Sequence, residues 1–176
     1  MTHAQDALDL YIRPALAWLE TSGHNPSANS RDAMTIMVAI ALRESDCWHK
    51  VQMSASGKPI PMLARGFWQF ERDGGVAEIC QHPALAWCRS AILDLGYEIE
   101  RDRLHEAIGY DQTLAAVMAR GLLWIDPAAL PAPVASSVEI AYAYYIRRWR
   151  PGRPRLEKWP ANWLSAVKAT REEWGE

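Results

Sequence analysis

Residues 30–45 read SRDAMTIMVAIALRES and include a run of seven apolar residues at 36–42. Ser30 is a favourable helix N-cap, and Asp32 places a negative charge in the first turn, where the helix dipole stabilises it. The apolar run leaves almost no polar face before Glu44. A helix that is apolar all round is buried on every side. The stretch therefore predicts a central, buried helix that ends near Glu44.

Apolar residues recur three and four positions apart over most of the remaining chain, a spacing typical of helices. We expect further helices at about 4–19, 76–81, 83–95, 98–108, 111–125, 136–149 and 161–174. Pro14 is expected to kink the first of them because it lacks an N–H. Asp111 is the expected N-cap of the helix at 111–125, which ends at a Pro-rich stop at 126–133. Ser136 or Ser137 is the expected N-cap of the following helix.

Strand signals are weak by comparison. Residues 53–64 are rich in Ser, Gly and Pro and are predicted to form a loop, with a small β-hairpin around residues 50–70 as the alternative. The chain contains no internal repeat and no Gly/Ser linker that would separate domains. We therefore predict an all-α, or mainly α, protein with a single domain over residues 1–176.

Composition narrows the classes of function. Hydrophobic residues make up 49% of the 176 residues and charged residues 23%, which excludes intrinsic disorder. Nineteen Lys and Arg against 21 Asp and Glu give a net charge of -2, so no general attraction to nucleic acid or to a membrane surface is expected. The N-terminus lacks the pattern of a secretory signal, and no apolar run approaches the roughly 18 residues that span a bilayer. We expect synthesis in the cytoplasm and a monomer without cofactor.

Glu44 is the first candidate for chemistry. Its side chain starts from a wall of aliphatic residues, and burial disfavours the charged form of a carboxyl group and raises its pKa. A carboxyl group with a raised pKa can act as a general acid near neutral pH, as protonation of a glycosidic oxygen requires. The alternative is an ordinary ion-pair residue beside Arg43.

Three further motifs follow Glu44-Ser45 in order along the chain. They are Ala64-Arg65-Gly66-Phe67-Trp68-Gln69, Ala141-Tyr142 and Trp149-Arg150-Pro151-Gly152. Over residues of about 36–152 the chain resembles the lytic transglycosylase and goose-type lysozyme superfamily. In that superfamily Glu-Ser ends a buried helix, Gly-x-x-Gln follows, and Ala-Tyr-Asn-Ala-Gly comes later.

The resemblance implies a lysozyme-like multi-helix domain that cleaves the β-1,4 bond between N-acetylmuramic acid and N-acetylglucosamine in peptidoglycan. It implies that Glu44 is the catalytic acid and base, and that Ser45 neighbours the substrate or the adjacent loop. It also implies that Gln69 lines the cleft and that Tyr142 lies close to Glu44. The chain departs from the pattern at Ala143, where the superfamily has Asn, and in a long insertion at 48–64.

Two mechanisms differ in their need for a second carboxylate. A hydrolase needs a base roughly 6.5–9.5 Å from the acid, or a nucleophile at roughly 5 Å. Glu71 and Asp73 are the candidates, with a solvated turn as their alternative role. A lytic transglycosylase uses one Glu twice and lets a hydroxyl group of the sugar attack. We expect the one-Glu mechanism, with the goose-type hydrolase as the alternative.

Aromatic residues could bind the sugar. Trp68 adjoins Gln69 and could stack on a sugar face, and Tyr142 and Tyr145 share one face of a predicted helix. For each ring, burial in the core is the competing interpretation. Tyr142 stands out because it belongs to a motif.

Two rival sites have weaker support. Cys47-Trp-His49, Cys80-Gln-His82 and Cys88 do not match a known zinc spacing, so we expect no metal and read the thiols as reduced. Residues 147–155 hold five Arg that could bind nucleic acid, but the rest of the chain is acidic, and the glycan interpretation is favoured.

The biological setting follows by inference. A domain that cuts the cell wall and carries no signal needs another route out, which favours a phage or prophage lysis protein, or a component of a virion or secretion system. Because Ala143 replaces Asn, a non-catalytic domain that binds glycan or builds a phage particle stays open as an alternative.

Overall fold

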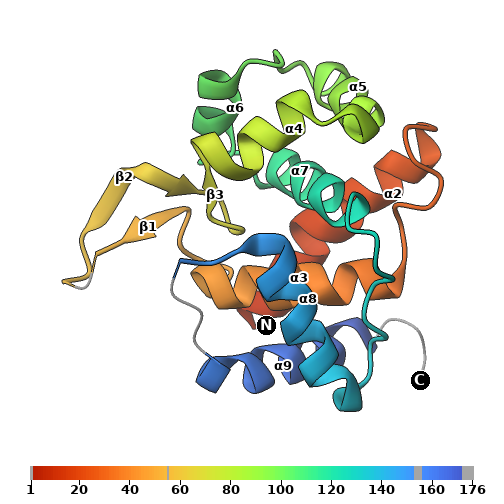
Figure 1. Cartoon of the computed structure of the whole chain (residues 1–176), viewed down its shortest axis with the longest axis vertical. Helices are drawn as coiled ribbons and strands as arrows, with labels where there is room; N and C mark the ends of the chain where they lie inside the picture. Colours follow the sequence, from red (N-terminus) through yellow and green to blue (C-terminus); the bar gives the residue numbers. More distant parts are fainter. Residues whose placement is uncertain (1, 55, 153–155, 172–176) are drawn as a thin grey trace.

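The computed structural model describes residues 2–54, 56–152 and 156–171 of the chain, and helices dominate them (Figure 1). The α-helices are α1 (His3–Ala7), α2 (Arg13–Thr21), α3 (Arg31–Ser45), α4 (Ala77–Gln81), α5 (Ala86–Asp94), α6 (Arg101–Ala107), α7 (Gln112–Trp124), α8 (Val138–Trp149) and α9 (Trp159–Arg171). One three-stranded antiparallel sheet accompanies them. The predicted mainly α class is therefore confirmed.

Helix α3 is the central element, as its sequence predicts. The Ser30 hydroxyl accepts a hydrogen bond from the Ala33 N–H at 3.2 Å, and every residue from Ala33 to Ala41 is buried. Helix α9 packs on one side of α3 and α7 on the other (Figure 1). Burial on all sides leaves only the C-terminal end of α3, where Glu44 lies, to face a cavity.

The N-terminal helix is interrupted where Pro14 disturbs it. Between α1 and α2, residues Leu8–Ile12 form a π turn, in which the Arg13 N–H donates to the Leu8 carbonyl five residues back. Pro14 has no N–H to give to the carbonyl of residue 10, so the wider turn accommodates the missing bond. The irregularity predicted at Pro14 thus lies just before it.

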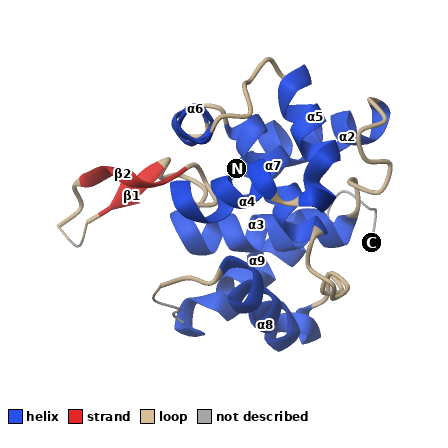
Figure 2. Cartoon of the chain, turned by 45° about the horizontal axis from the view of Figure 1, so that its top comes forward, coloured by secondary structure: helices blue, strands red, loops and turns tan. Residues whose placement is uncertain are grey.

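The sheet contains β1 (Val51–Met53), β2 (Pro59–Arg65) and β3 (Phe70–Glu71) in that spatial order. Strands β1 and β2 form a hairpin that projects from the helices (Figure 2). The alternative of a hairpin at 50–70 is confirmed, and the loop predicted for 53–64 is wrong over most of its length. Its prolines suggested a loop, but the register of the β1–β2 pair shifts between Val51 and Gln52, and such an irregularity tolerates a residue without an N–H.

Helix ends agree with the sequence where a side chain caps them. The Asp111 carboxylate accepts from the N–H groups of Thr113 and Leu114, which confirms this cap. Ser137 is the N-cap residue of α8, as predicted, but its side chain makes no capping hydrogen bond, because residues Ala135–Ser137 form a 3-10 turn that leads into the helix. The end of the helix predicted at 161–174 lies outside the described residues, whereas α9 starts earlier, at Trp159.

Helix α9 completes the core, although it lies beyond the motifs. Trp159 and Trp163 are fully buried, and the hydroxyl groups of Thr35 and Thr170 share a buried hydrogen bond of 2.7 Å between α3 and α9. Within the described part of the chain, no helix is long and apolar enough to cross a membrane.

Candidate active site

A cavity of about 1090 Å³ lies at the C-terminal end of α3. Its other walls come from the β1–β2 hairpin, the segment after β3, and the last turn of α8. Within residues 48–64, residues such as Gln52 and Ile60 supply the hairpin wall. Glu44, Gln69 and Tyr145 line the cavity together although they are far apart in sequence.

Glu44 lies half-buried in the wall of this cavity. Burial raises its pKa, and the negative charge of Glu71 adds to the rise. A hydrogen bond from the Tyr145 hydroxyl to Oε1 and the charge of Arg43 act in the opposite direction, and burial prevails. Glu44 is therefore a carboxyl group that retains its proton to higher pH than an exposed one.

Tyr145 is the partner that holds Glu44. Its ring is fully buried and stacks on the ring of Trp159 at a centroid distance of 4.8 Å. Burial, followed by the nearby charge of Glu44, raises the pKa of Tyr145, so its hydroxyl group stays protonated and donates. Two helices, α8 and α9, thereby determine where the carboxyl group of Glu44 points.

Tyr142 lies one helical turn before Tyr145. It is not one of the described residues that line the cavity. Its half-buried ring contacts Tyr145 at a centroid distance of 6.2 Å and Trp159 at 5.7 Å. The position close to Glu44 that the resemblance implied for Tyr142 is thus occupied by Tyr145. Residues three apart share a helix face, so the sequence indicated both tyrosines; the motif singled out Tyr142, whereas the structure brings Tyr145 to Glu44.

Ser45 joins α3 to the Gly66–Gln69 turn. Its buried hydroxyl donates to the Phe67 carbonyl at 2.7 Å and lies 3.1 Å from the Ala41 carbonyl. Of the two positions implied for Ser45, this hydrogen bond provides the contact with the adjacent loop, and Ser45 also lines the cavity. The hydrogen bond aligns the turn with Glu44.

The turn itself needs Gly66. This residue has a φ of +74°, and a Cβ there would lie 2.9 Å from the Ile108 carbonyl oxygen. Three residues later Gln69 lines the cavity, with Nε2 donating to the Gly66 carbonyl at 2.9 Å. The Phe67 N–H donates to Oε1 of buried Gln112 at 2.9 Å. Gln112 was not among the residues that the sequence indicated. Its only signal is a polar residue at the start of an apolar helix.

Backbone strain concentrates around the same cavity. In the described ranges, the non-glycine residues with positive φ are Asp46, Cys47, Gln69 and Arg150. Three of them line the cavity, and Cys47 follows directly on Asp46. Such backbone conformations cost free energy and cluster at functional sites. Asp46 and Arg150 are the left-handed C-caps of α3 and α8, a common helix ending, so Gln69 is the cavity-lining residue whose positive φ no helix end explains.

Trp68 belongs to the core. It is fully buried, and its indole N–H donates to the Met37 carbonyl at 3.0 Å. A ring enclosed in this way offers no face to a sugar, which corrects the stacking role expected for it. Trp149 lines the cavity instead and donates its indole N–H to the Trp68 carbonyl at 2.9 Å. The sequence indicated Trp149 only as part of the motif Trp149-Arg150-Pro151-Gly152.

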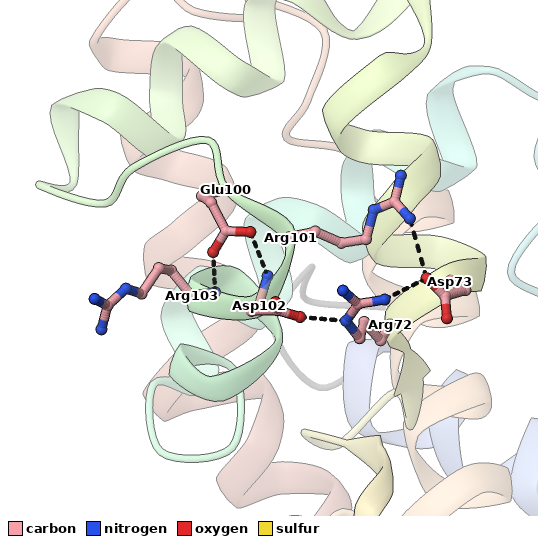
Figure 3. Close-up of polar contacts among 6 residues, drawn as sticks. All are labelled: Arg72, Asp73, Glu100, Arg101, Asp102 and Arg103. Carbon is pink, nitrogen blue, oxygen red and sulfur yellow. Dashed lines mark hydrogen bonds and ion pairs between the residues drawn. The ribbon is translucent and has the colours of Figure 1, made fainter.

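The two candidate second carboxylates are separated by the fold. Glu71 lines the cavity. Asp73 instead pairs with Arg72 at 2.7 Å and Arg101 at 3.0 Å, in a cluster of ion pairs between the segment after β3 and α6 (Figure 3). Because Asp73 pairs with two guanidinium groups outside the cavity, Glu71 is the one of the two that could serve the chemistry of the cavity.

The described cysteine and histidine side chains of the rival site do not form a metal site. Cys47, Cys80 and Cys88 are free thiols, and burial raises the pKa of Cys88 to about 12. Among the residues whose positions are described, no three His, Cys, Asp or Glu side chains gather as metal ligands would. In the basic stretch, Arg147 pairs with Asp126 and Arg148 with Glu78, and part of this stretch lies outside the described ranges.

No protein-family model, curated protein or solved structure matches the chain. A function is therefore proposed from the residues of the cavity. They provide a proton donor with a raised pKa, a tyrosine that stabilises its conjugate base, and a second carboxylate in the same wall.

Proposed function

We propose that this protein cleaves the β-1,4 bond between N-acetylmuramic acid and N-acetylglucosamine in peptidoglycan, with Glu44 as the catalytic acid and base. One observation carries the proposal: burial raises the pKa of Glu44 in the wall of a cavity of about 1090 Å³. Glycoside cleavage needs such a carboxyl group, because the leaving oxygen must be protonated as its bond to carbon breaks.

The favoured mechanism is that of a lytic transglycosylase, in which one Glu acts twice. Glu44 gives its proton to the glycosidic oxygen, and the bond from that oxygen to the sugar carbon breaks. A hydroxyl oxygen of the same sugar then bonds to this carbon, and its proton passes to the Glu44 carboxylate. The hydrogen bond from Tyr145 stabilises that carboxylate between the two steps. The product is an anhydro sugar.

A hydrolase of the goose type is the second candidate, and the position of Glu71 favours it. Glu71 lines the same cavity and its charge acts on Glu44. It could activate a water molecule while Glu44 protonates the leaving oxygen. The product would then have an ordinary reducing end.

The test is mass spectrometry of the fragments that the full chain releases from purified peptidoglycan. We expect anhydro products from the unmodified chain and none from Glu44→Gln, which keeps the shape but cannot give a proton. Glu71→Gln should remain active under the one-Glu mechanism and be inactive in a hydrolase. Asp73→Asn is the matched control and should cleave normally, since Asp73 pairs outside the cavity. Cleavage by Glu44→Gln at the unmodified rate would refute the proposal.

A further inference from the structure

One face of α8 presents three side chains to the cavity: Tyr145, Arg148 and Trp149. Residues three and four apart lie on the same face of a helix. Arg148 therefore follows Tyr145 by about 4.5 Å along the helix axis, at 1.5 Å per residue. A group bound by Arg148 would lie about one helical turn from the hydrogen bond between Tyr145 and Glu44.

Arg148 is buried and incompletely paired. Only 7% of its side chain is exposed, and its Nη2 donates to Oε2 of Glu78. Its Nε is buried and has no hydrogen-bond partner among the described residues. A buried donor without a partner costs free energy, and an acceptor that reaches this Nε would recover that cost.

The neighbouring Arg147 shows what complete pairing looks like in this helix. Its Nε donates to Oδ2 of Asp126 at 3.0 Å and its Nη2 to Oδ1 at 2.9 Å. One carboxylate thus satisfies both donors on that edge of the guanidinium group. Glu78 satisfies only one of the two corresponding donors of Arg148, and Glu78 itself lines the cavity.

We infer that Arg148 forms a subsite for a carboxylate carried by the bound glycan, one helical turn from Glu44. The incoming carboxylate displaces Glu78 and pairs with Nε and Nη2 together, while Glu78 keeps the guanidinium group positioned beforehand. Arg150 and Lys158 also line the cavity and add positive charge. This inference rests on the proposed function, because in peptidoglycan the carboxylates belong to the peptide stems, whereas chitin has none. Arg148 is thus a residue that selects acidic glycans over neutral ones.

Calorimetric binding to the full chain tests the subsite. All variants carry Glu44→Gln so that no glycan is cleaved. The probes are a peptidoglycan tetrasaccharide with free stem carboxylates, the same compound with these carboxylates amidated, and neutral chitotetraose. We expect the acidic form to bind about tenfold more tightly than the amidated form. Arg148→Gln should abolish this preference, and Arg148→Lys should keep only part of it, because Lys cannot form the paired contact.

Arg147→Gln is the matched control, since it removes the same charge from the adjacent position but outside the cavity. It should leave the preference at about tenfold. Chitotetraose should bind all variants alike. Glu78→Gln provides a test that does not depend on the folding of the Arg148 variants: it removes the competing carboxylate and should tighten binding of the acidic glycan severalfold.

Three results would overturn the subsite: equal binding of the acidic and amidated glycans, equal losses in Arg147→Gln and Arg148→Gln, or weaker acidic binding in Glu78→Gln. Failure of the proposed function can be distinguished from failure of the subsite. If the unmodified chain releases no fragments from peptidoglycan but the acidic preference depends on Arg148, the enzymatic proposal fails and the subsite stands. If it cleaves without that preference, only the subsite fails.

Discussion

The raised pKa of Glu44 has a consequence for stability. In the unfolded chain a Glu carboxyl group has a pKa of about 4.3. Burial raises the pKa of Glu44 in the folded protein, so between the two values the folded state binds more protons than the unfolded state. The free energy of unfolding therefore falls as pH rises through this window, and at neutral pH the protein is less stable than it would be with an uncharged group. The carboxyl group suited to acid catalysis weakens the fold that carries it.

Glu44→Gln should therefore stabilise the protein while it abolishes cleavage. At pH 7 we expect a gain on the order of 1 kcal/mol in the free energy of unfolding, a common size for repair of an unfavourable functional group. The gain should vanish at about pH 3, well below the pKa of the unfolded chain, where Glu44 is protonated in both states. Urea unfolding at the two pH values measures it. Glu139→Gln, at an exposed position of α8, should show no such pH-dependent gain. Equal stability of the Glu44 variant and the unmodified chain at pH 7 would contradict this account.

At the scale of elements, the turn from Gly66 to Gln69 joins three parts of the fold. Ser45 holds it to α3, Gln112 holds it to α7, and it connects β2 to β3. Each contact involves a residue distant in sequence, so the position of the turn depends on the packing of the elements around it. Because Gly66 has no Cβ, it can adopt a positive φ and approach Ile108 closely, which allows that packing.

Gly66→Ala should destabilise the protein more than Gly57→Ala. Both glycines have nearly the same φ, +74° and +75°, so the cost of placing Ala in that conformation is shared. Only at Gly66 would the new Cβ meet an atom, the Ile108 carbonyl oxygen at 2.9 Å, whereas nothing lies within 4 Å of it at Gly57. We expect about 1 kcal/mol for Gly57→Ala and roughly 2–4 kcal/mol for Gly66→Ala in thermal unfolding. Equal losses would show that the turn can move away from Ile108, at the C-terminal end of α6, without penalty.

At the scale of the whole molecule, helix α9 belongs to the same core as the motif-bearing part. It packs on α3, and its Trp159 stacks on Tyr145, the partner of Glu44. Trp163 is fully buried and donates its indole N–H to the Val134 carbonyl at 2.9 Å. The residues beyond the motifs therefore contribute to the rigidity of the site.

Trp163→Ala should cost about 3–5 kcal/mol, the usual penalty for emptying the space of a buried aromatic side chain. Leu164→Ala is its matched control on the same helix, because Leu164 is 49% exposed, and it should cost less than about 1 kcal/mol. Denaturant unfolding measures both variants. A loss at Trp163 no larger than at Leu164 would mean that α9 is not part of the cooperative core.

Local features of the chain were predictable from the sequence. The caps at Ser30 and Asp111 and the apolar character of α3 involve residues within a few positions of one another. The same local reasoning placed Glu44 at the end of a buried helix. The β2 strand was not predictable in this way, because pairing with β1 and β3 outweighs the preference of its prolines for a loop.

Tertiary structure alone decided which side chains meet. The sequence offered two tyrosines on one face of α8, and the packing of α8 on α9, with Tyr145 stacked on Trp159, brings Tyr145 to Glu44. The sequence also offered Glu71 and Asp73, two positions apart, as second carboxylates. In the structure Glu71 lines the cavity, whereas Asp73 pairs with arginines outside it. Spacing along the chain defines a helix and its faces, whereas the rotation of each element against its neighbours depends on contacts between residues that are distant in sequence.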